Sequence, residues 1–146
     1  MFRGNHPTRI DEKGRLKVPA DFKRVLDEKY GQRFYITSRD GKIAELYPIE
    51  EWERVENKLS NLPSANPAVK KFLNTTNYWG QEVEIDGQGR LLMPGLLREA
   101  AALKGDVAVV GHLNHLEVRV LEEYRKSIEE NPITAEDEQA LSQLGF

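Results

Sequence analysis

Cysteine is missing from the 146 residues of the chain. Its absence excludes disulfides, thiolate metal sites and cysteine nucleophiles, and it agrees with a cytoplasmic location. The sequence also lacks an apolar run of about 18 residues, so it predicts no transmembrane helix. The segment that starts at Met1 has no apolar centre of the kind found in signal peptides. These absences together predict a cytoplasmic globular protein without a membrane partner.

An overall excess of positive charge, which is typical of nucleic-acid-binding proteins, is missing as well, because the formal net charge is -3. The charge is unevenly distributed, however. Residues 1–24 carry seven Lys and Arg against three acids, whereas the rest of the chain carries 14 bases and 21 acids. The local sign of the charge steers a polyanion more than the total does. The N-terminal segment is therefore the candidate anion-binding region.

A ten-residue element is present twice. Residues 10–19 read Ile-Asp-Glu-Lys-Gly-Arg-Leu-Lys-Val-Pro, and residues 85–94 read Ile-Asp-Gly-Gln-Gly-Arg-Leu-Leu-Met-Pro. Isoleucine, aspartate, glycine, arginine, leucine and proline recur at the same offsets, seventy-five residues apart. Two copies at so long a period do not fit a solenoid, so the repeat predicts two halves of one pseudo-symmetric domain.

The residue pattern around each copy predicts the element order β-β-α-β-β-α. In the first copy, two strands flank the turn at 11–14, and they are followed by a helix over 19–30, strands over 34–38 and 43–47, and a helix from Pro48. In the second copy, two strands lie within 82–93, and a helix follows from Pro94 and ends at Gly105. Next come strands over 107–110 and 116–120, which the loop 111–115 joins, and a helix over 121–130.

The chain divides into four predicted segments. They are a first repeat at 1–62, a linker with a short helix at 63–77, a second repeat at 78–130 and an acidic C-terminal tail at 131–146. Asn66 before Pro67 predicts the start of the linker helix, and Thr134 predicts the start of a tail helix. The predicted fold class is α+β.

The Asp-x-x-Gly-Arg part of each copy has a structural and a functional interpretation. In the structural one, the aspartate accepts backbone hydrogen bonds, the glycine takes a positive φ angle and the arginine pairs with the carboxylate. In the functional one, Arg15 and Lys13 project towards an anion such as DNA. The two interpretations are compatible, and a solvated charged hairpin is the alternative. The residues that shape the two loops are predicted to be Asp11, Gly14, Asp86, Gly89 and Arg90.

The two copies differ in charge. Basic residues in the first copy lie at positions 9, 13, 15 and 17, and the matched residues in the second are Glu84, Gln88, Arg90 and Leu92. Basic residues at two-residue spacing lie on one face of a strand. We therefore assign anion binding to the first copy and expect Arg90 to serve mainly folding or assembly.

No catalytic centre is predicted. Asp11 and Asp86 each lie beside an arginine of their own loop, which keeps a carboxylate ionised instead of poised as an acid. His112 and His115 supply two potential zinc ligands without a third, so no metal or other cofactor is predicted. His6, which lies in the basic N-terminal segment, is interpreted as a phosphate contact.

These motifs resemble those of the MraZ family of bacterial transcriptional regulators in the AbrB/SpoVT-like superfamily. The resemblance rests on the Met-Phe-Arg-Gly start and on the two Asp-x-x-Gly-Arg-Leu-x-x-Pro elements, and it covers residues 1–130. It implies two tandem AbrB-like, swapped-hairpin repeats that form one pseudo-symmetric, β-rich, barrel-like unit with peripheral helices. It also implies that subunits close into a ring homo-oligomer, of about eight or more copies.

The resemblance further implies a function. The ring would bind short direct repeats of double-stranded DNA in its own promoter and repress the division and cell-wall gene cluster, as a nucleoid-associated cytoplasmic protein and not as an enzyme. No small-molecule substrate is evident. Two alternatives are an antitoxin-like protein whose main partner is a toxin, and a ring scaffold for other proteins. The predicted DNA contacts are Arg3, His6, Arg9, Lys13, Arg15 and Lys17.

Overall fold

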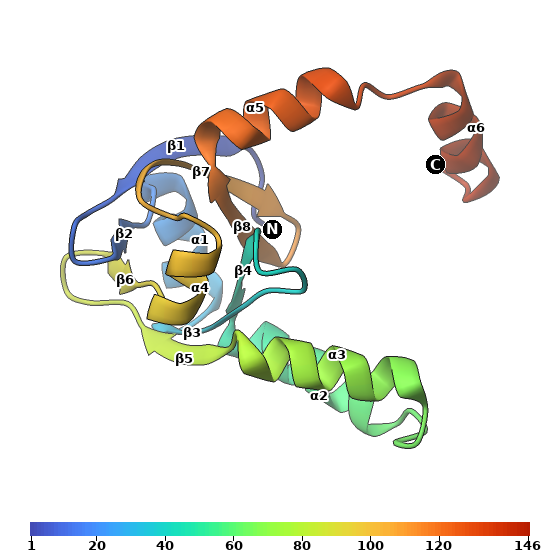
Figure 1. Cartoon of the computed structure of the whole chain (residues 1–146), viewed down its shortest axis with the longest axis horizontal. Coiled ribbons are helices and arrows are strands. Elements are labelled where there is room, and N and C mark those ends of the chain that lie inside the picture. Colours follow the sequence, from blue (N-terminus) through green and yellow to red (C-terminus); the bar gives the residue numbers. More distant parts are fainter.

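Two β-β-α-β-β-α units follow one another along the chain, as the repeat predicted (Figure 1). The computed structural model describes residues 1–146. Its first unit consists of β1 (Asn5–Ile10), β2 (Arg15–Lys17), α1 (Ala20–Lys29), β3 (Arg33–Thr37), β4 (Ala44–Pro48) and α2 (Ile49–Ser60). The second consists of β5 (Gln81–Glu84), β6 (Arg90–Leu92), α4 (Gly95–Ala100), β7 (Gly105–His112), β8 (His115–Val120) and α5 (Leu121–Glu130). Helix α3 (Pro67–Tyr78) joins the units, and α6 (Ala135–Gln143) follows the second.

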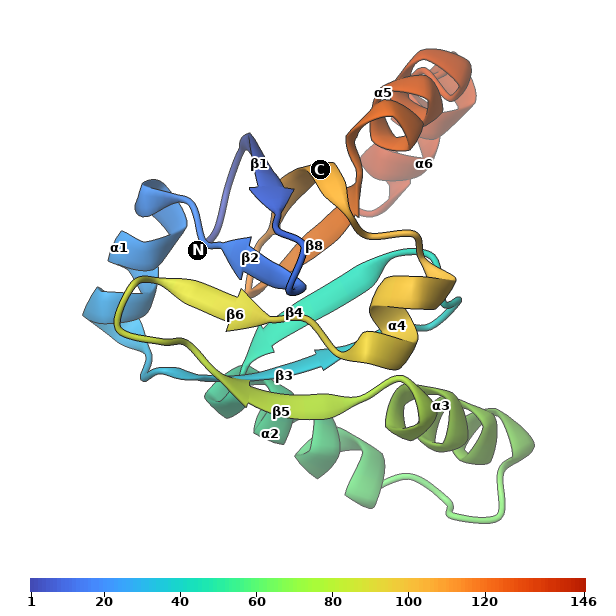
Figure 2. The ribbon, with the colours of Figure 1, turned by 60° about the vertical axis from the view of Figure 1, so that its left-hand side comes forward.

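The strands of the two units interlock in one antiparallel sheet. Its order is β5-β3-β4-β8-β7-β1-β2-β6, so β1 pairs with β7, β3 with β5, β4 with β8 and β2 with β6. Each of these four pairings joins strands from different repeats. In Figure 2 the sheet curls until its edge strands β5 and β6 lie near each other, which gives a nearly closed barrel. The predicted α+β, barrel-like fold of two tandem repeats is confirmed.

The hydrophobic core fills the inside of this curled sheet. Leu16 of β2 lies opposite Leu91 of β6, and both side chains are fully buried. Helix α1 adds Phe22 and Leu26 to the same core. Burying one such side chain contributes roughly 1.5–3 kcal/mol, so the pairing of the two repeats is stabilised by residues from both.

Two helical arms extend from the barrel, away from the β1–β2 and β5–β6 loops (Figure 1). In one arm, Trp52 of α2 stacks on Phe72 of α3 with ring centroids 6.5 Å apart. Asn66 caps α3 by accepting a hydrogen bond from the Ala68 amide at 2.9 Å, as predicted. In the other arm, Thr134 caps α6, and α6 has no fully buried residue. None of the helices is long and apolar enough to cross a membrane.

Two boundaries differ from the predictions. The helix expected to end at Gly105 ends at Ala100, because Ala102 turns the chain with a φ of 53°, and Gly105 begins β7 instead. Strands β7 and β8 extend into the expected loop 111–115, so that His112 and His115 pair across a two-residue turn. Such a turn requires positive φ, which Leu113 supplies at 62°.

Candidate nucleic-acid interface

The two Asp-x-x-Gly-Arg loops have the same hydrogen-bonded geometry. The Asp11 carboxylate accepts from the Lys13 and Arg15 amides at 3.0 and 2.9 Å, and Asp86 accepts from the Gln88 and Arg90 amides at 2.8 and 2.9 Å. The second carboxylate oxygen accepts from the arginine Nε of its own loop, at 2.8 Å for Arg15 and 3.2 Å for Arg90. Each aspartate therefore fixes both the loop and the arginine that follows it.

The electrostatics of these aspartates follow from that geometry. The backbone amide of Arg15 is the main reason that the pKa of Asp11 lies below its usual value, and the Arg15 guanidinium lowers it further. The Arg90 amide does the same for the pKa of Asp86. Both carboxylates are ionised at neutral pH, because hydrogen bonds to the charged form favour it. They are structural anions that hold arginines in place.

The loops lie side by side because each is hydrogen-bonded to the other repeat. The Val18 amide donates to the Gly89 carbonyl at 2.9 Å, and the Met93 amide donates to the Gly14 carbonyl at the same distance. These bonds are related by the internal repeat. The two motifs, seventy-five residues apart in sequence, thus form one end of the barrel.

Basic side chains line the outer face of the β2–β6 pair. Leu16 and Leu91 point into the core, so their neighbours Arg15, Lys17 and Arg90 point outward. Lys17 lies directly opposite Arg90 in the register of the two strands. Like charges at directly opposed positions of an antiparallel pair are destabilising. A bound polyanion would remove that cost.

An open groove of about 1240 Å³ runs between the first loop and helix α4. Six basic and three acidic side chains line it, a formal charge of +3 on a chain whose total is -3. The basic residues are Arg9, Arg15, Lys17, Arg90, Arg98 and Lys104. The positive charge and open form of this surface suit a phosphate backbone better than a small apolar ligand.

Sequence reasoning missed two of these groove residues, Arg98 and Lys104. The Arg98 guanidinium lies over Gly14 and is 3.5 Å from the Lys13 carbonyl and 3.4 Å from the Met93 carbonyl. The sequence did contain a signal for Arg98: it occupies the position in the second copy that matches Lys23 in the first, and both residues are basic. Arg90, expected to serve mainly the fold, lines the groove as well as bonding to Asp86.

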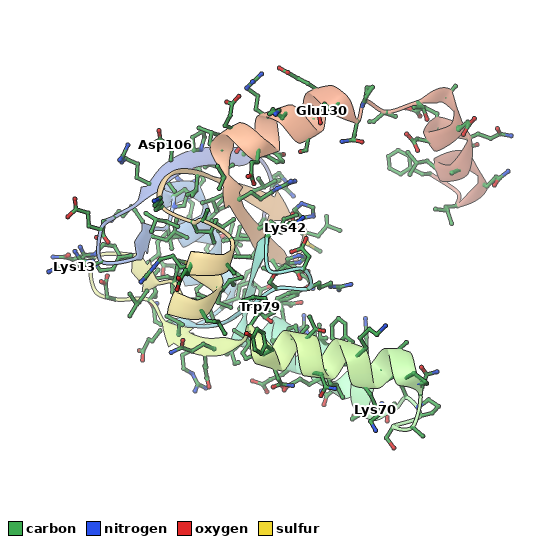
Figure 3. All side chains as sticks on the ribbon, viewed as in Figure 1. Lys13, Lys42, Lys70, Trp79, Asp106 and Glu130 are labelled. Atoms are coloured by element: carbon green, nitrogen blue, oxygen red, sulfur yellow. The ribbon has the colours of Figure 1, made fainter.

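The structure brings some of the predicted contacts together and separates others. Arg9 lies at the groove and pairs with Asp106 across the β1–β7 ladder at 2.9 Å. Lys13 is at the loop tip and projects away from the barrel (Figure 3). Arg3 precedes β1, six residues before Arg9, and this spacing corresponds to about 20 Å along a strand.

His6 is also set apart from the groove. Its ring packs edge-on against Phe22 of α1, with centroids 4.7 Å apart, and its Nε2 lies 3.7 Å from the Asp21 carboxylate. The imidazole is thus half-buried against α1. Contacts from Arg3 and His6 require DNA that extends along β1 beyond the groove.

The fold and the paired loops define a class of protein: a tandem-repeat barrel of swapped β-hairpins with a basic groove at one end. Comparison of sequences gives the family. A family model described as "MraZ protein, putative antitoxin-like" matches residues 1–75 and 80–144. The chain belongs to the MraZ family.

Relatives in this family match the whole chain or most of it. A protein of Koribacter versatilis is 64% identical over 147 residues, and one of Acidobacterium capsulatum is 61% identical over 146 residues, each with 100% of both chains covered. A protein of Syntrophobacter fumaroxidans is 40% identical over 117 residues, which cover 80% of this chain and 77% of the relative. All three are named Transcriptional regulator MraZ.

Proposed function

We propose that the chain is a sequence-specific DNA-binding transcriptional regulator, which acts as a repressor of the division and cell-wall gene cluster. The observation that carries the proposal is the groove with a formal charge of +3 on a net-acidic chain. The names of the relatives support it. The site of action is the nucleoid in the cytoplasm, and regulation of this kind requires no catalysis.

The loop geometry supports different roles for the individual basic residues in DNA binding. Asp11 engages only the Nε of the Arg15 side chain, so the terminal nitrogens of Arg15 make no hydrogen bond within the chain. Two parallel N–H donors held in a fixed direction suit the O6 and N7 atoms of guanine in the major groove. Lys13 and Lys17 carry compact ammonium charges that suit phosphates, and the Lys17 ammonium also donates to the Gln88 carbonyl. Arg15 thus provides base recognition, and the lysines provide affinity.

A ring of subunits would make this small site effective. One loop with a few basic groups binds DNA weakly, with a salt slope of roughly 0.9 per neutralised phosphate. Linking sites in a ring raises the effective concentration, by about 10²–10⁴ in avidity, when the promoter carries direct repeats at matching spacing. Exposed apolar residues on the helical arms, such as Tyr78 and Ile128, support self-association.

The experiment that tests the proposal is a gel-shift titration with the DNA upstream of the protein's own gene. We expect Arg15→Ala to abolish the specific shift while native mass spectrometry shows the same oligomer as the wild type. Arg33→Ala is the matched control, because Arg33 is an exposed, ion-paired arginine on β3 that does not line the groove. Unchanged affinity in Arg15→Ala would refute the assignment of that residue.

A second experiment tests the promoter target and the ring. Footprinting on the same upstream DNA should show protection at regularly spaced direct repeats, and native mass should give a closed oligomer. Protection without repeats, or a monomer, would contradict this part of the proposal. Binding to promoter DNA would remain testable by gel shift in either case.

The alternative partner is a protein. The description of the family as antitoxin-like favours this candidate, as does the exposed α6 arm. Two complete repeats count against it, because antitoxins of the superfamily are expected to carry one copy and a disordered toxin-binding tail. The test is a pull-down with tag-free protein as competitor. Capture of a protein that the competitor displaces, together with absence of DNA binding at physiological salt, would favour a toxin or a scaffolded protein over promoter DNA.

A further inference from the structure

A second cluster of polar side chains lies on the outer face of β4, β8 and β7. His112 and His115 are directly paired across the β7–β8 turn, and Glu117 follows His115 on the same face of β8. Glu45 of β4 is directly paired with Glu117. Two imidazoles and two carboxylates therefore occupy neighbouring positions of one sheet face, with Ala44, Leu46, Leu116 and Val118 pointing the other way into the core.

We propose that His112, His115 and Glu117, with Glu45 as a fourth ligand, form a binding site for a divalent transition-metal ion, for which Zn²⁺ is the probe. One ligand atom of each of the first three residues lies within 4.8 Å of those of the other two. This site is independent of the proposed DNA binding. Sequence spacing showed only two ligands, and the strand register supplies the others.

The distances are close to those of a tetrahedral site. Zinc bonds of 2.0–2.2 Å place neighbouring ligand atoms about 3.3–3.6 Å apart in a tetrahedron. His112 Nε2 lies 3.3 Å from Glu117 Oε1, and His115 Nε2 lies 3.7 Å from Glu45 Oε1. The remaining separations among His112, His115 and Glu117 are at most 4.8 Å and need to contract by about 1.5 Å at most, which a torsion of the exposed His112 side chain allows.

The hydrogen bonds around His115 set its Nε2 free to bind a metal. The Asn114 side-chain amide donates to Glu51 Oε2 at 3.0 Å, so its oxygen faces the other way, towards His115 Nδ1 at 2.9 Å. Because that oxygen only accepts, Nδ1 carries the proton and Nε2 keeps its lone pair. A metal-bound histidine typically has this arrangement, with its second nitrogen donating to an outer acceptor.

Packing fixes the direction of the same imidazole. The Tyr47 ring stacks on the His115 ring, with centroids 4.3 Å apart and planes 11° from parallel. The His115 side chain is only 14% exposed, and that of Glu45 is 11% exposed. A preorganised histidine beside a preorganised carboxylate is the geometry that metal affinity requires.

Glu45 divides its two oxygens between two partners. Oε2 lies 3.6 Å from the Arg39 guanidinium, whereas Oε1 faces His115 and the Tyr47 hydroxyl, which is 3.4 Å away. Arg39 therefore holds the carboxylate without occupying the oxygen that a metal would use. The directly opposed Glu45 and Glu117 repel each other in the absence of a cation between them. A divalent ion would relieve this repulsion.

The imidazole and carboxylate ligands determine which metal ions the site can bind. Imidazole ligands suit zinc, copper, nickel and iron, whereas magnesium and calcium require a shell of oxygens. The cluster is also distinct from the groove, because Gly105 lines the groove and His112 lies at the other end of β7, about 23 Å along the strand. The metal site is thus predicted to bind zinc but not magnesium, and without DNA.

The test is calorimetric titration of the tag-free, full-length oligomer with Zn²⁺ and, separately, Mg²⁺. We expect one Zn²⁺ per chain and no heat from Mg²⁺. His112→Ala should weaken Zn²⁺ binding by more than tenfold, and Asn114→Ala by about 10–100-fold through loss of the outer hydrogen bond. His6→Ala is the matched control, since His6 is the remaining histidine and packs on α1, and its affinity for Zn²⁺ should equal that of the wild type.

Two variants distinguish loss of the metal site from loss of folding. The His112 side chain is 47% exposed, so its removal leaves the core intact, and Glu117→Gln keeps the shape of its side chain while weakening a ligand. Without metal, neither variant should have a Tm below that of the wild type, since His112 is exposed and Glu117→Gln removes the repulsion from Glu45. Both variants should lose the Tm increase that Zn²⁺ gives the wild type. Absence of Zn²⁺ binding to the wild type, or binding that is equally strong in His112→Ala and Glu117→Gln, would overturn the proposal.

Discussion

The first loop is built around Gly14, and replacing this residue by alanine tests the loop geometry directly. Gly14 has a φ of 84°, and a Cβ atom there would lie 1.4 Å from an Nη atom of Arg98. The matched Gly89 has a φ of 76°, but its Cβ would meet only the flexible end of Lys17 at 3.3 Å. The two alanine variants therefore share the backbone strain and differ in the displacement of Arg98.

The magnitude follows from these two contributions. An alanine in the left-handed region costs roughly 1–2 kcal/mol. Displacing the Arg98 guanidinium adds the loss of its contacts with two carbonyls, which are long at 3.4 and 3.5 Å and contribute about 0.5–1 kcal/mol each. We expect a loss in unfolding free energy of about 2–4 kcal/mol for Gly14→Ala and about 1–2 kcal/mol for Gly89→Ala. At about 3 °C per kcal/mol, these losses correspond to Tm decreases of about 6–12 °C and 3–6 °C.

The assay is thermal unfolding followed by circular dichroism at one fixed protein concentration, since oligomers have concentration-dependent Tm values. Gly87→Ala is the control, because no atom lies within 4 Å of a Cβ there. Its Tm should stay within about 2 °C of the wild type, as expected of an exposed substitution. In a Gly14→Ala background, Arg98→Ala should cost less than it does alone, because the displaced Arg98 has already lost its contacts and its removal relieves the clash. Equal Tm losses for Gly14→Ala and Gly89→Ala would refute the placement of Arg98.

Two further predictions concern charge in the same loops. Lys17→Leu, which copies the residue at the matched position 92, should lower the salt slope of DNA binding by about 0.9 per subunit. The Tm should change little, because removal of the like-charge pair with Arg90 offsets the loss of the Lys17 hydrogen bond to the Gln88 carbonyl. An unchanged slope in a salt-dependent gel shift would contradict the phosphate contact. The second prediction concerns pH. Hydrogen bonds from backbone amides lower the pKa of Asp11 in the folded state, so the ionised carboxylate stabilises the fold above its unfolded pKa of about 3.9. That contribution disappears as the pH falls through the folded pKa. Asp11→Asn should therefore lower the Tm at pH 7, and the difference from the wild type should shrink towards pH 3; a constant difference across this pH range would refute the linkage.

The loops could be predicted from sequence in detail because their interactions are local. Asp11 and Asp86 bond to residues two and four positions later, and Asn66 and Thr134 cap helices that begin at the next residue. Interactions of such short range depend on residue type and spacing alone. The glycine of the first loop could be assigned a positive φ for the same reason.

Helix and strand ends were harder to place where a non-glycine residue adopts positive φ. Ala102 ends the segment after α4, and Leu113 forms the β7–β8 turn, although neither residue type favours that conformation. Tertiary packing of the flanking strands offsets the backbone strain of the positive φ angles at these two residues. The wrong assignment of the 111–115 segment as a loop hid the cross-strand pair of His112 and His115.

Sequence alone determined the duplication, the order of elements, the shape of each loop and the excess of basic residues in the first copy, because all of these depend on residue types and their order along the chain and not on contacts in space. Only the tertiary structure decided which strands pair, and every pairing between repeats depends on contacts between distant residues. Those pairings set Arg90 opposite Lys17, lay Arg98 over Gly14 and brought Glu45 beside Glu117. Register across a sheet is fixed by burial of one face of each strand, and a shift of one residue would turn these side chains to the other face. The basic groove and the histidine–glutamate cluster are therefore products of the swapped pairing and not of either repeat by itself.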